Sequence, residues 1–285
     1  LRLVGSEMCI RDRYLQRIKE DFSIETTSKS TKIITKDCNY LYGVGAGRNF
    51  KELNLYMELK RNALKNIEKH DLQFPKKTYT DIDYYCFSDR LLDMELGEVY
   101  PKVVEFDVNK AYYTTAYRMR LIDKDFYEKC IGLPKSIRLR LIGSLATQKR
   151  RIDYVNGKPM SYTPPKRDDV LRDAWFNIVD YVDSCLKEVA EMCGDRFLFY
   201  WVDGIYLEGE GKDFKDILNV ITQKYGLDFK EEGVEQMTME LDSMGNQFVG
   251  VYKTALKHST KRNYKPFYIK KRRNYANTDR VTRGV

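Results

Sequence analysis

Apolar residues recur along the chain at two spacings, and each spacing predicts a type of element. Apolar positions three or four residues apart predict helices over residues 50–70, 137–150, 168–192 and 213–225. Residues 111–119 can also form a helix. Short apolar runs predict strands over residues 31–35, 100–106, 197–202, 205–207, 237–241, 248–254 and 266–272. From residue 100 onward, the order is strand, helices, strand, turn, strand, helix, strand.

The stretch from Phe199 to Leu207 reads as two apolar strands joined at Asp203-Gly204. Asp-Gly is a strong signal for a two-residue hairpin turn, because both central positions of a type I′ turn require a positive φ. The first of these strands is apolar at nearly every position, so it is expected to be buried on both faces. A carboxylate at its tip must then be turned outward, hydrogen-bonded or bound to a cation. Taken alone, Asp203 is an ordinary turn residue.

A second carboxylate, Asp107, stands where another predicted strand turns into a helix. Taken alone, it would be a helix N-cap. The β-α-β-β-α-β order predicts an α+β, ferredoxin-like fold, an antiparallel sheet with helices on one face. In such a sheet the first strand lies beside the hairpin, so Asp107 is expected next to Asp203. Two carboxylates at close range raise each other's pKa unless a cation lies between them. Mg²⁺ prefers such oxygen ligands, and two ions can clamp a phosphoryl transfer.

Positive charge gathers at the C-terminal end of the chain. The formal net charge is +8, and residues 253–285 hold 11 Lys and Arg against one acidic residue, Asp279. Five aromatic side chains are interleaved with these basic residues, at Tyr252, Tyr264, Phe267, Tyr268 and Tyr275. Basic and aromatic residues together suit phosphate backbones and base stacking. A solvated basic tail is the alternative interpretation.

Cysteine and histidine usage argues against a zinc site. Besides Cys9 there are five cysteines without a Cys-x-x-Cys pair, and the chain has only two histidines. Scattered cysteines without a secretion signal fit a reducing cytoplasm. No run approaches the ~20 apolar residues of a membrane span, so no membrane association is expected.

Residues 1–13 do not fit the rest of the chain. The run from Arg2 to Arg13 resembles the conceptual translation of a transposase-based sequencing adapter. No apolar segment follows its basic residues, which argues against a signal peptide. We expect residues 1–13 to be non-native and the chain to be a fragment that begins near Tyr14. The further division expected is a segment of unclear role (14–95), a main domain (96–250) with a helical insertion at about 109–193, and a basic nucleic-acid-binding segment (251–285).

Four runs, taken in order, carry a recognisable pattern. Phe106-Asp107-Val-Asn-Lys-Ala-Tyr112-Tyr-Thr is similar to motif A of family B DNA polymerases, Asp-x-x-Ser-Leu-Tyr-Pro-Ser. Ile142-Gly143-Ser144-Leu145-Ala-Thr-Gln-Lys149 is similar to motif B, and Tyr200-Trp-Val-Asp203-Gly-Ile-Tyr206 to motif C. Tyr268-Ile-Lys-Lys271-Arg-Arg-Asn-Tyr275-Ala276 is similar to the Lys-Lys-Arg-Tyr segment downstream of the palm. Residues 100–276 therefore resemble the palm of a compact family B DNA polymerase, phage- or plasmid-borne, with fingers-like helices inserted.

The resemblance implies transfer of a nucleotide from a dNTP to the 3′-OH of a DNA primer on a template. Asp107 and Asp203 would hold two Mg²⁺ ions, with Mn²⁺ as an alternative, and the Val108 carbonyl would be a further ligand. Tyr112 falls where the family places the aromatic residue that stacks under the sugar and excludes a 2′-OH. Contacts to the primer–template are implied for Lys270, Lys271, Arg272, Arg273 and Tyr275.

The chain departs from the family pattern in motif B. Leu139, Gly143 and Ala146 stand where that motif has Lys, Asn and Tyr. A neighbouring arginine would then have to neutralise the triphosphate. Arg140 is the first choice, because Arg140, Ser144 and Thr147 fall on one face of the predicted helix; Arg138 is the second.

Motif C and the flanking domains also depart from the pattern. Trp201 replaces the first Asp of motif C, and Gly204 replaces the Ser that follows the second Asp. The usual thumb and the exonuclease carboxylate motifs are not visible. Two other interpretations stay open: a reverse transcriptase-like palm polymerase, and a catalytically inactive nucleic-acid-binding module of the same fold.

Overall fold

The computed structural model describes residues 22–27, 30–34, 39–43, 50–100, 102–146, 150–155, 158–160, 166–253 and 263–269. The chain divides into two compact units that alternate along the sequence. The first unit comprises Leu1–Pro75 and Leu121–Trp175, and the second comprises Lys76–Arg120 and Phe176–Val285. Residues 14–95, expected as one segment, are thus divided between the two units. Residues 1–13 lie outside the described residues.

The first unit contains an antiparallel sheet and several helices. Its strands are β1 (Phe22–Thr27), β2 (Ser30–Ile34), β3 (Asn39–Gly43), β7 (Arg150–Val155) and β8 (Lys158–Met160), in the order β3-β2-β1-β7-β8. Its helices are α2 (Phe50–His70), α5 (Lys124–Ile131), α6 (Lys135–Gly143) and the 3₁₀ helix η1 (Ser144–Ala146). The long helix α7 (Lys166–Cys193) begins in this unit and ends in the second.

Helix α2 has the bounds that its apolar spacing predicts. Leu59 and Ala63 are fully buried, four residues apart on one face. On the polar side, Glu58 pairs with Lys129 of α5 at 2.7 Å.

The helix predicted over residues 137–150 is shorter in the structure. Helix α6 ends at Gly143, η1 follows, and β7 begins at Arg150. β7 pairs with β1, with Ile152 opposite Ile24. The predicted helical insertion therefore also contains two strands, because β7 pairs with a strand far away in the sequence.

The second unit is built on an eight-stranded sheet. Its strands are β4 (Tyr85–Phe87), β5 (Val99–Tyr100), β6 (Val103–Val108), β9 (Phe197–Trp201), β10 (Gly204–Glu208), β11 (Phe229–Leu241), β12 (Gln247–Lys253) and β13 (Asn263–Tyr268). Their order is β13-β12-β11-β6-β10-β9-β4, and β5 pairs with β11. Its helices are α3 (Asp89–Leu92), α4 (Ala111–Arg118), the C-terminal part of α7, α8 (Lys215–Tyr225), and the 3₁₀ helices η2 (Gly194–Arg196) and η3 (Gly211–Phe214).

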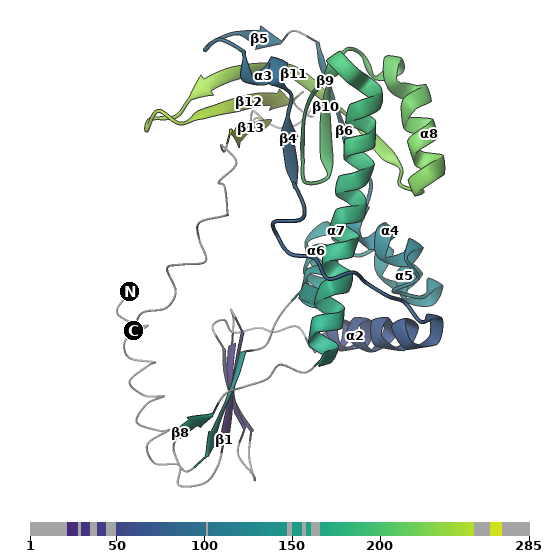
Figure 1. Ribbon diagram of the computed structural model, residues 1–285, viewed down its shortest axis with the longest axis vertical. Coiled ribbons are helices and arrows are strands. Elements are labelled where there is room, and N and C mark those ends of the chain that lie inside the picture. The colour runs from purple at the N-terminus through teal and green to yellow at the C-terminus, as the bar shows by residue number, and fades with distance from the viewer. Residues whose placement is uncertain are drawn as a thin grey trace. The chain divides into compact units, whose positions relative to one another are not determined.

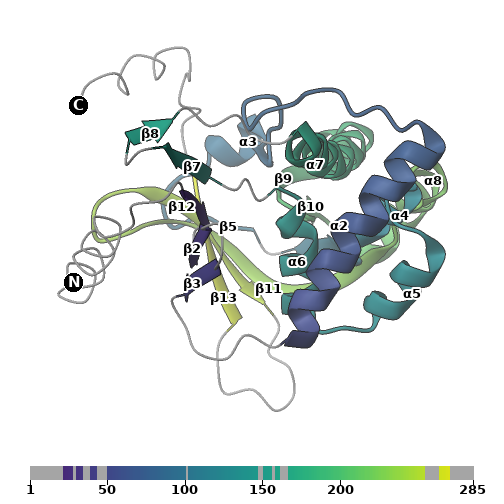
Figure 2. The same ribbon diagram turned by 90° about the horizontal axis from the view of Figure 1, so that it is seen from below.

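The predicted β-α-β-β-α-β order is present in this sheet. Strand β6 lies between β10 and β11, and both pairs are antiparallel. The last strand differs from its prediction, because β11 begins at Phe229 and its polar half, Phe229–Gly233, pairs with β6. The apolar half predicted from the sequence pairs with β12 instead. Figure 2 shows β11 as a long curved strand.

The two faces of this sheet pack against different partners. On one face, Val104, Phe106 and Val108 of β6 form a core with apolar residues of α7 and α8. Figure 1 shows these two helices alongside β6, β9 and β10. The opposite face carries the alternating residues of the same strands, including Phe199 and Tyr206, with Phe267 of β13 packed on them.

The hairpin turn is shifted by one residue from its prediction. Gly204 pairs with Trp201, so the two central residues are Val202 and Asp203. Val202 has a φ of 61°, whereas Gly204 lies in β10 without a positive φ. A positive φ at the first central position alone is the backbone of a type II′ turn, and not the type I′ turn that Asp-Gly predicts. No helix in the described part of the chain is long and apolar enough to span a bilayer.

Candidate active site

The structure places Asp107 beside the turn that carries Asp203. Asp107 lies opposite Gly204 in the β6–β10 pair. The backbone N–H of Val108 donates to the Asp203 carbonyl at 2.8 Å. The end of β6 is therefore joined to the hairpin turn by a backbone hydrogen bond, as the order of elements predicts.

Five residues form one row across the second unit's sheet on the face opposite α7 and α8. Cross-strand pairs join Tyr85 to Trp201, Trp201 to Gly204, Gly204 to Asp107, and Asp107 to Lys230. Directly paired residues of antiparallel strands share a face. We call this set the Asp107 row. It brings an aromatic pair, a glycine, a carboxylate and an ammonium group into line.

A second row runs beside the Asp107 row, two residues along each strand. It consists of Phe87, Phe199, Tyr206, Glu105 and Glu232. Tyr206 and Glu105 are almost fully buried. Burial and the Glu105 carboxylate raise the pKa of the Tyr206 phenol, which therefore stays protonated and able to donate a hydrogen bond.

The two carboxylates at one end of this second row belong to an ion cluster. Lys253 of β12 places its Nζ 2.5 Å from Glu105 and 3.2 Å from Glu232. Glu232 in turn pairs with Lys230 of the Asp107 row at 2.8 Å. Burial favours the neutral form of Lys253, but its two carboxylate partners outweigh burial and raise the pKa of Lys253. Lys253 is thus held in its charged form beside a buried carboxylate two residues from Asp107.

Tyr112 lies in α4, five residues after Asp107 in the sequence. It packs against the core formed with α7 and α8. Burial, and then the nearby carboxylate of Asp203 with a smaller effect of Asp107, raises the pKa of the Tyr112 phenol. Asp107, Asp203 and Tyr112 therefore belong to one electrostatic neighbourhood in which the phenol is neutral.

The backbone around the two carboxylates is strained at three residues that are not glycine. Tyr84, Lys110 and Val202 have φ values of 56°, 55° and 61°. Lys110 is the residue before α4, and the Val202 N–H donates to the Tyr84 carbonyl at 2.7 Å. Such conformations cost about 1–3 kcal/mol each and persist where the surroundings enforce them, commonly at functional sites.

The other residues expected in the site belong to the first unit or lie outside the described residues. Arg138, Arg140 and Ser144 belong to the first unit. The Arg138 side chain donates to the Leu133 carbonyl at 2.9 Å, and the Ser144 hydroxyl donates to the Leu141 carbonyl at 2.6 Å. Because α6 ends at Gly143, Arg140 and Ser144 do not share one continuous α-helix face. The basic segment with Lys270, Lys271, Arg272, Arg273 and Tyr275 lies outside the described residues, as does Thr147.

The side chains at the tip of β6 suit a magnesium ion better than a softer metal. The donors are two carboxylates, and within the described residues no group of three or more His, Cys, Asp or Glu side chains is arranged to hold a metal. Mg²⁺ is commonly bound through one or two carboxylates, with waters and substrate phosphates completing its octahedron. The donor set therefore fits Mg²⁺ held jointly with a phosphate-bearing substrate.

Sequence reasoning missed Glu105, Lys230, Glu232 and Lys253. Glu105 could have been found from the period of two along β6, which puts it on the same face as Asp107. The three others are identified only by strand pairing, because they come from β11 and β12.

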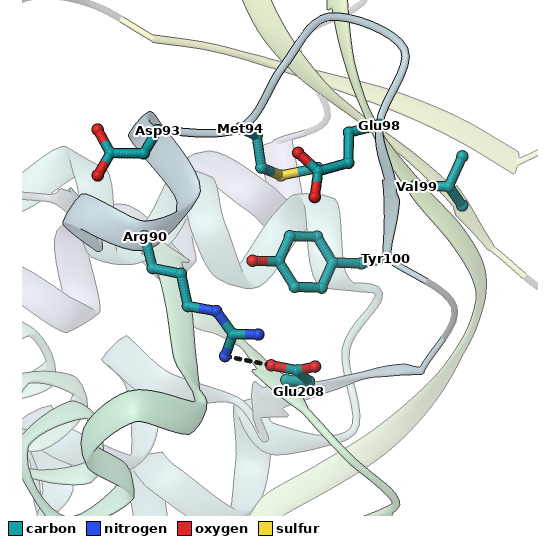
Figure 3. A pocket seen from close by; sticks show the side chains of 7 residues that line it. All are labelled: Arg90, Asp93, Met94, Glu98, Val99, Tyr100 and Glu208. Atoms are coloured by element: carbon teal, nitrogen blue, oxygen red, sulfur yellow. Dashed lines mark ion pairs between the residues drawn. The ribbon is translucent and has the colours of Figure 1, made fainter.

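A cavity of about 330 Å³ lies elsewhere in the second unit. Figure 3 shows its lining residues, among them Arg90, Tyr100 and Glu208. Glu208 ends β10, whereas Gly204 beside Asp203 begins it, so the cavity lies at the opposite end of that strand. Arg90 forms an ion pair with Glu208 and lies 5.5 Å from the centre of the Tyr100 ring. These contacts pair Arg90 with Glu208 inside the cavity, and we assign the cavity no role in the chemistry.

No protein-family model matches this chain, and no curated protein matches it in sequence. Its function is therefore inferred from the geometry and chemistry of the site.

Proposed function

We propose that this protein is a template-directed DNA polymerase of the family B type, with the second unit as its palm. The observation that carries the proposal is the pairing of Asp107 with the hairpin turn of Asp203 at adjacent strand ends. Both carboxylates belong to a sheet of β-α-β-β-α-β order. The order of the sequence motifs supports the same assignment.

In this proposal the primer 3′-oxygen attacks the α-phosphorus of a dNTP. One phosphorus–oxygen bond forms, the bond to the β-phosphate breaks, and pyrophosphate leaves. Asp107 and Asp203 would hold the divalent cations, together with the Val108 carbonyl. Two Mg²⁺ ions would lower the pKa of the attacking hydroxyl and neutralise the triphosphate. Tyr112 lies under the incoming sugar, and its neutral phenol adds no negative charge to a site that binds polyphosphate.

Additional residues complete the proposed site. Arg140 or Arg138 would neutralise the triphosphate, and Lys270–Arg273 with Tyr275 would bind the primer–template backbone. Lys230 is a further candidate for contact with phosphate, because it is exposed and lies opposite Asp107 in the sheet.

The test is extension of a labelled DNA primer on a DNA template with Mg²⁺ and dNTPs. We expect Asp203→Asn and Asp107→Asn each to reduce extension by at least 100-fold, about 2.7 kcal/mol of transition-state stabilisation. Asp216→Asn is the matched control, since Asp216 is an exposed carboxylate of α8 and makes the same change of charge. Extension by the control should stay within twofold of the wild type.

The alternatives give different results in the same assay. Extension on RNA templates at a rate equal to that on DNA would favour the reverse transcriptase-like palm. If the wild-type chain binds DNA but does not extend the primer, the result would favour the catalytically inactive nucleic-acid-binding module. Equal extension by wild type and Asp203→Asn would refute the assignment of this residue to the chemistry.

A further inference from the structure

The segment that leads into β4, residues 77–84, is joined to α7 at both of its ends. Lys77 forms an ion pair with Asp180 at 2.6 Å, and Asp83 forms one with Lys187 at 2.8 Å. Asp180 and Lys187 are two helical turns apart in α7, so they lie on the same face of the helix. Figure 1 shows the chain crossing α7 on its way to β4. The segment is therefore held against one face of α7 by side-chain charges.

Lys187 bridges two carboxylates at the second of these contacts. Its Nζ also lies 2.9 Å from Asp183 Oδ2, and the Asp183 side chain is only 3% exposed. Burial lowers the pKa of Lys187, but the hydrogen bonds and charges of Asp83 and Asp183 outweigh burial and raise it. The lysine is therefore charged, and its pairing with a buried residue of α7 fixes where its ammonium group meets Asp83.

Tyr84, the residue after Asp83, has a strained backbone that contacts the hairpin turn. Its φ is 56°, and the Tyr85 N–H donates across it to the Asp83 carbonyl at 2.6 Å. A three-residue turn with a positive φ at its centre is rare and strained. The Tyr84 carbonyl accepts a hydrogen bond of 2.7 Å from the N–H of Val202, whose φ is 61° and which directly precedes Asp203. One hydrogen bond thus joins two strained residues, and one of them adjoins a proposed cation ligand.

The side chain of Tyr84 lies close to the proposed nucleotide-binding residue Tyr112. Burial raises the pKa of the Tyr84 phenol, and the charges of Tyr79 and Asp183 add to this rise. Burial and the Asp203 carboxylate raise the pKa of the Tyr112 phenol, and Tyr84 and Asp183 add to that rise too. The contact between the segment and α7 is therefore within electrostatic reach of the candidate active site.

A contribution to stability alone does not explain the position of this ion pair. Asp83 and Lys187 are 33% and 42% exposed, and pairs at such positions contribute little to stability. Glu188, the next residue of α7, forms a pair of the same kind with Lys224 of α8 at 2.5 Å. The partner of Lys187 differs, because Asp83 precedes the residue whose carbonyl holds the turn of Asp203.

We propose that Asp83 and Lys187 are positioning residues that hold the Asp203 carboxylate in place through Tyr84 and the hairpin turn. This inference rests on the proposed polymerase function and names what keeps the second carboxylate beside Asp107. Without the ion pair, the Tyr84 backbone can leave its strained conformation, and the turn loses a hydrogen-bond acceptor. The separation of the two carboxylates then varies, so cations shared between them are held less well.

Asp83→Ala is the first variant, because it removes the contact of the segment and leaves the pair of Lys187 with Asp183 in α7 intact. We expect kcat for primer extension to fall by roughly 10- to 100-fold, since misplacing a reacting group by about 1 Å can cost 100-fold. The Mg²⁺ concentration for half-maximal rate should rise. KM for primer should stay unchanged, because no contact with DNA is altered.

Lys187→Met should give the same changes, and Lys187→Arg should recover most of the rate because it keeps the charge. The matched controls are Glu188→Ala and Lys224→Met, which break the neighbouring ion pair and should extend primer at the wild-type rate. Urea unfolding of each variant shows whether it is folded under the assay conditions. A merely structural role would change the unfolding midpoint and leave the Mg²⁺ dependence of the folded enzyme unaltered.

Amide hydrogen exchange of Val202 supplies a measurement that needs no enzymatic activity. Its N–H is hydrogen-bonded to the Tyr84 carbonyl, so it exchanges only when that bond opens. We expect exchange of this amide, followed by NMR, to be at least about 10-fold faster in Asp83→Ala than in the wild type. In Glu188→Ala its rate should not change.

Two results would overturn the positioning role. One is unchanged exchange of Val202 in Asp83→Ala, and the other is faster exchange with unaltered kcat and Mg²⁺ dependence. If Asp203→Asn still abolishes extension in either case, the positioning role fails and the polymerase function stands. If the wild-type protein extends no primer, the polymerase function fails, and the exchange rate of Val202 alone decides whether the ion pair holds the turn.

Discussion

Lys253 is expected to stabilise the second unit by neutralising a buried carboxylate next to the proposed active site. Its side chain is 10% exposed, and that of Glu105, 2.5 Å away, is 4% exposed. The change to test is Lys253→Met, which keeps the length and apolar stem of the side chain and removes the ammonium group. Glu105 then remains buried without its direct ion-pair partner, and Lys265 is the cation left in its electrostatic neighbourhood.

The expected cost follows from burial. Removing one partner of a buried ion pair typically costs 3–5 kcal/mol, because an unpaired charge is left away from water. The contact with Glu232 adds little, within about 1 kcal/mol, since that carboxylate is 30% exposed and also pairs with Lys230. We therefore expect Lys253→Met to lower the free energy of unfolding by about 3 kcal/mol.

Urea unfolding followed by Trp201 fluorescence in the Trp175→Phe background measures this cost close to the cluster. The cycle includes Glu105→Gln, Lys253→Met and the double variant. The double variant should lose much less than the sum of the single variants, because neither charge is then left alone. Additive losses, or a loss below about 1 kcal/mol for Lys253→Met, would contradict the assignment of a buried ion pair.

The pH dependence gives an independent check on the same pair. The pKa of Lys253 is raised in the folded protein, so its contribution to stability is fully present below the unfolded value of about 10.4. It is lost as the pH rises through the folded pKa. The stability difference between wild type and Lys253→Met should be constant from neutral pH to about pH 10 and shrink above it.

Two further predictions concern Gly204 and the thiols. Gly204→Ala should leave the free energy of unfolding unchanged or raise it by up to about 1 kcal/mol, because Gly204 has no positive φ and its added methyl meets no atom closer than 3.6 Å. Primer extension should nevertheless fall, since the methyl group would lie 4.0 Å from Asp107 Oδ1, beside the proposed cation site; full activity would contradict the proposed position of that site. Iodoacetamide at pH 8 should alkylate the exposed Cys86 in the native protein within minutes and spare Cys185 and Cys193, whose pKa values burial raises to about 12 and about 11. Peptide mass spectrometry identifies the alkylated cysteines. Modification of Cys185 at a rate equal to that of Cys86 would contradict the prediction and show that solvent reaches the core around α7.

Local patterns in the sequence determined most of the elements. The bounds of α2 follow from apolar residues at helical spacing, a property of one face of one helix. The sheet order around β6 follows from the sequence of strands and helices, because few topologies bury both faces of such a set. The position of Asp107 beside the turn of Asp203 could be predicted from the sequence for the same reason.

Tertiary structure alone decided the register of the strands and the residues that pairing brings together. The polar half of β11 has no apolar pattern of its own and becomes a strand because it pairs with β6. β7 forms against β1, whose residues lie far away in the chain. Hydrogen bonding to a distant strand outweighs local preference in both cases.

The hairpin turn and the ion cluster also show which features the sequence predicts and which features strand pairing decides. Asp203-Gly204 predicts a turn of one type, but the pairing of Trp201 with Gly204 moves the turn to Val202 and Asp203 and forces a β-branched residue to a positive φ. Lys253 meets Glu105 only because β12 and β6 both flank β11. The sequence by itself predicted that Asp107 lies beside the hairpin turn of Asp203. Which side chains surround them was decided by cross-strand register, since register depends on packing of the whole sheet and on no single stretch of the chain.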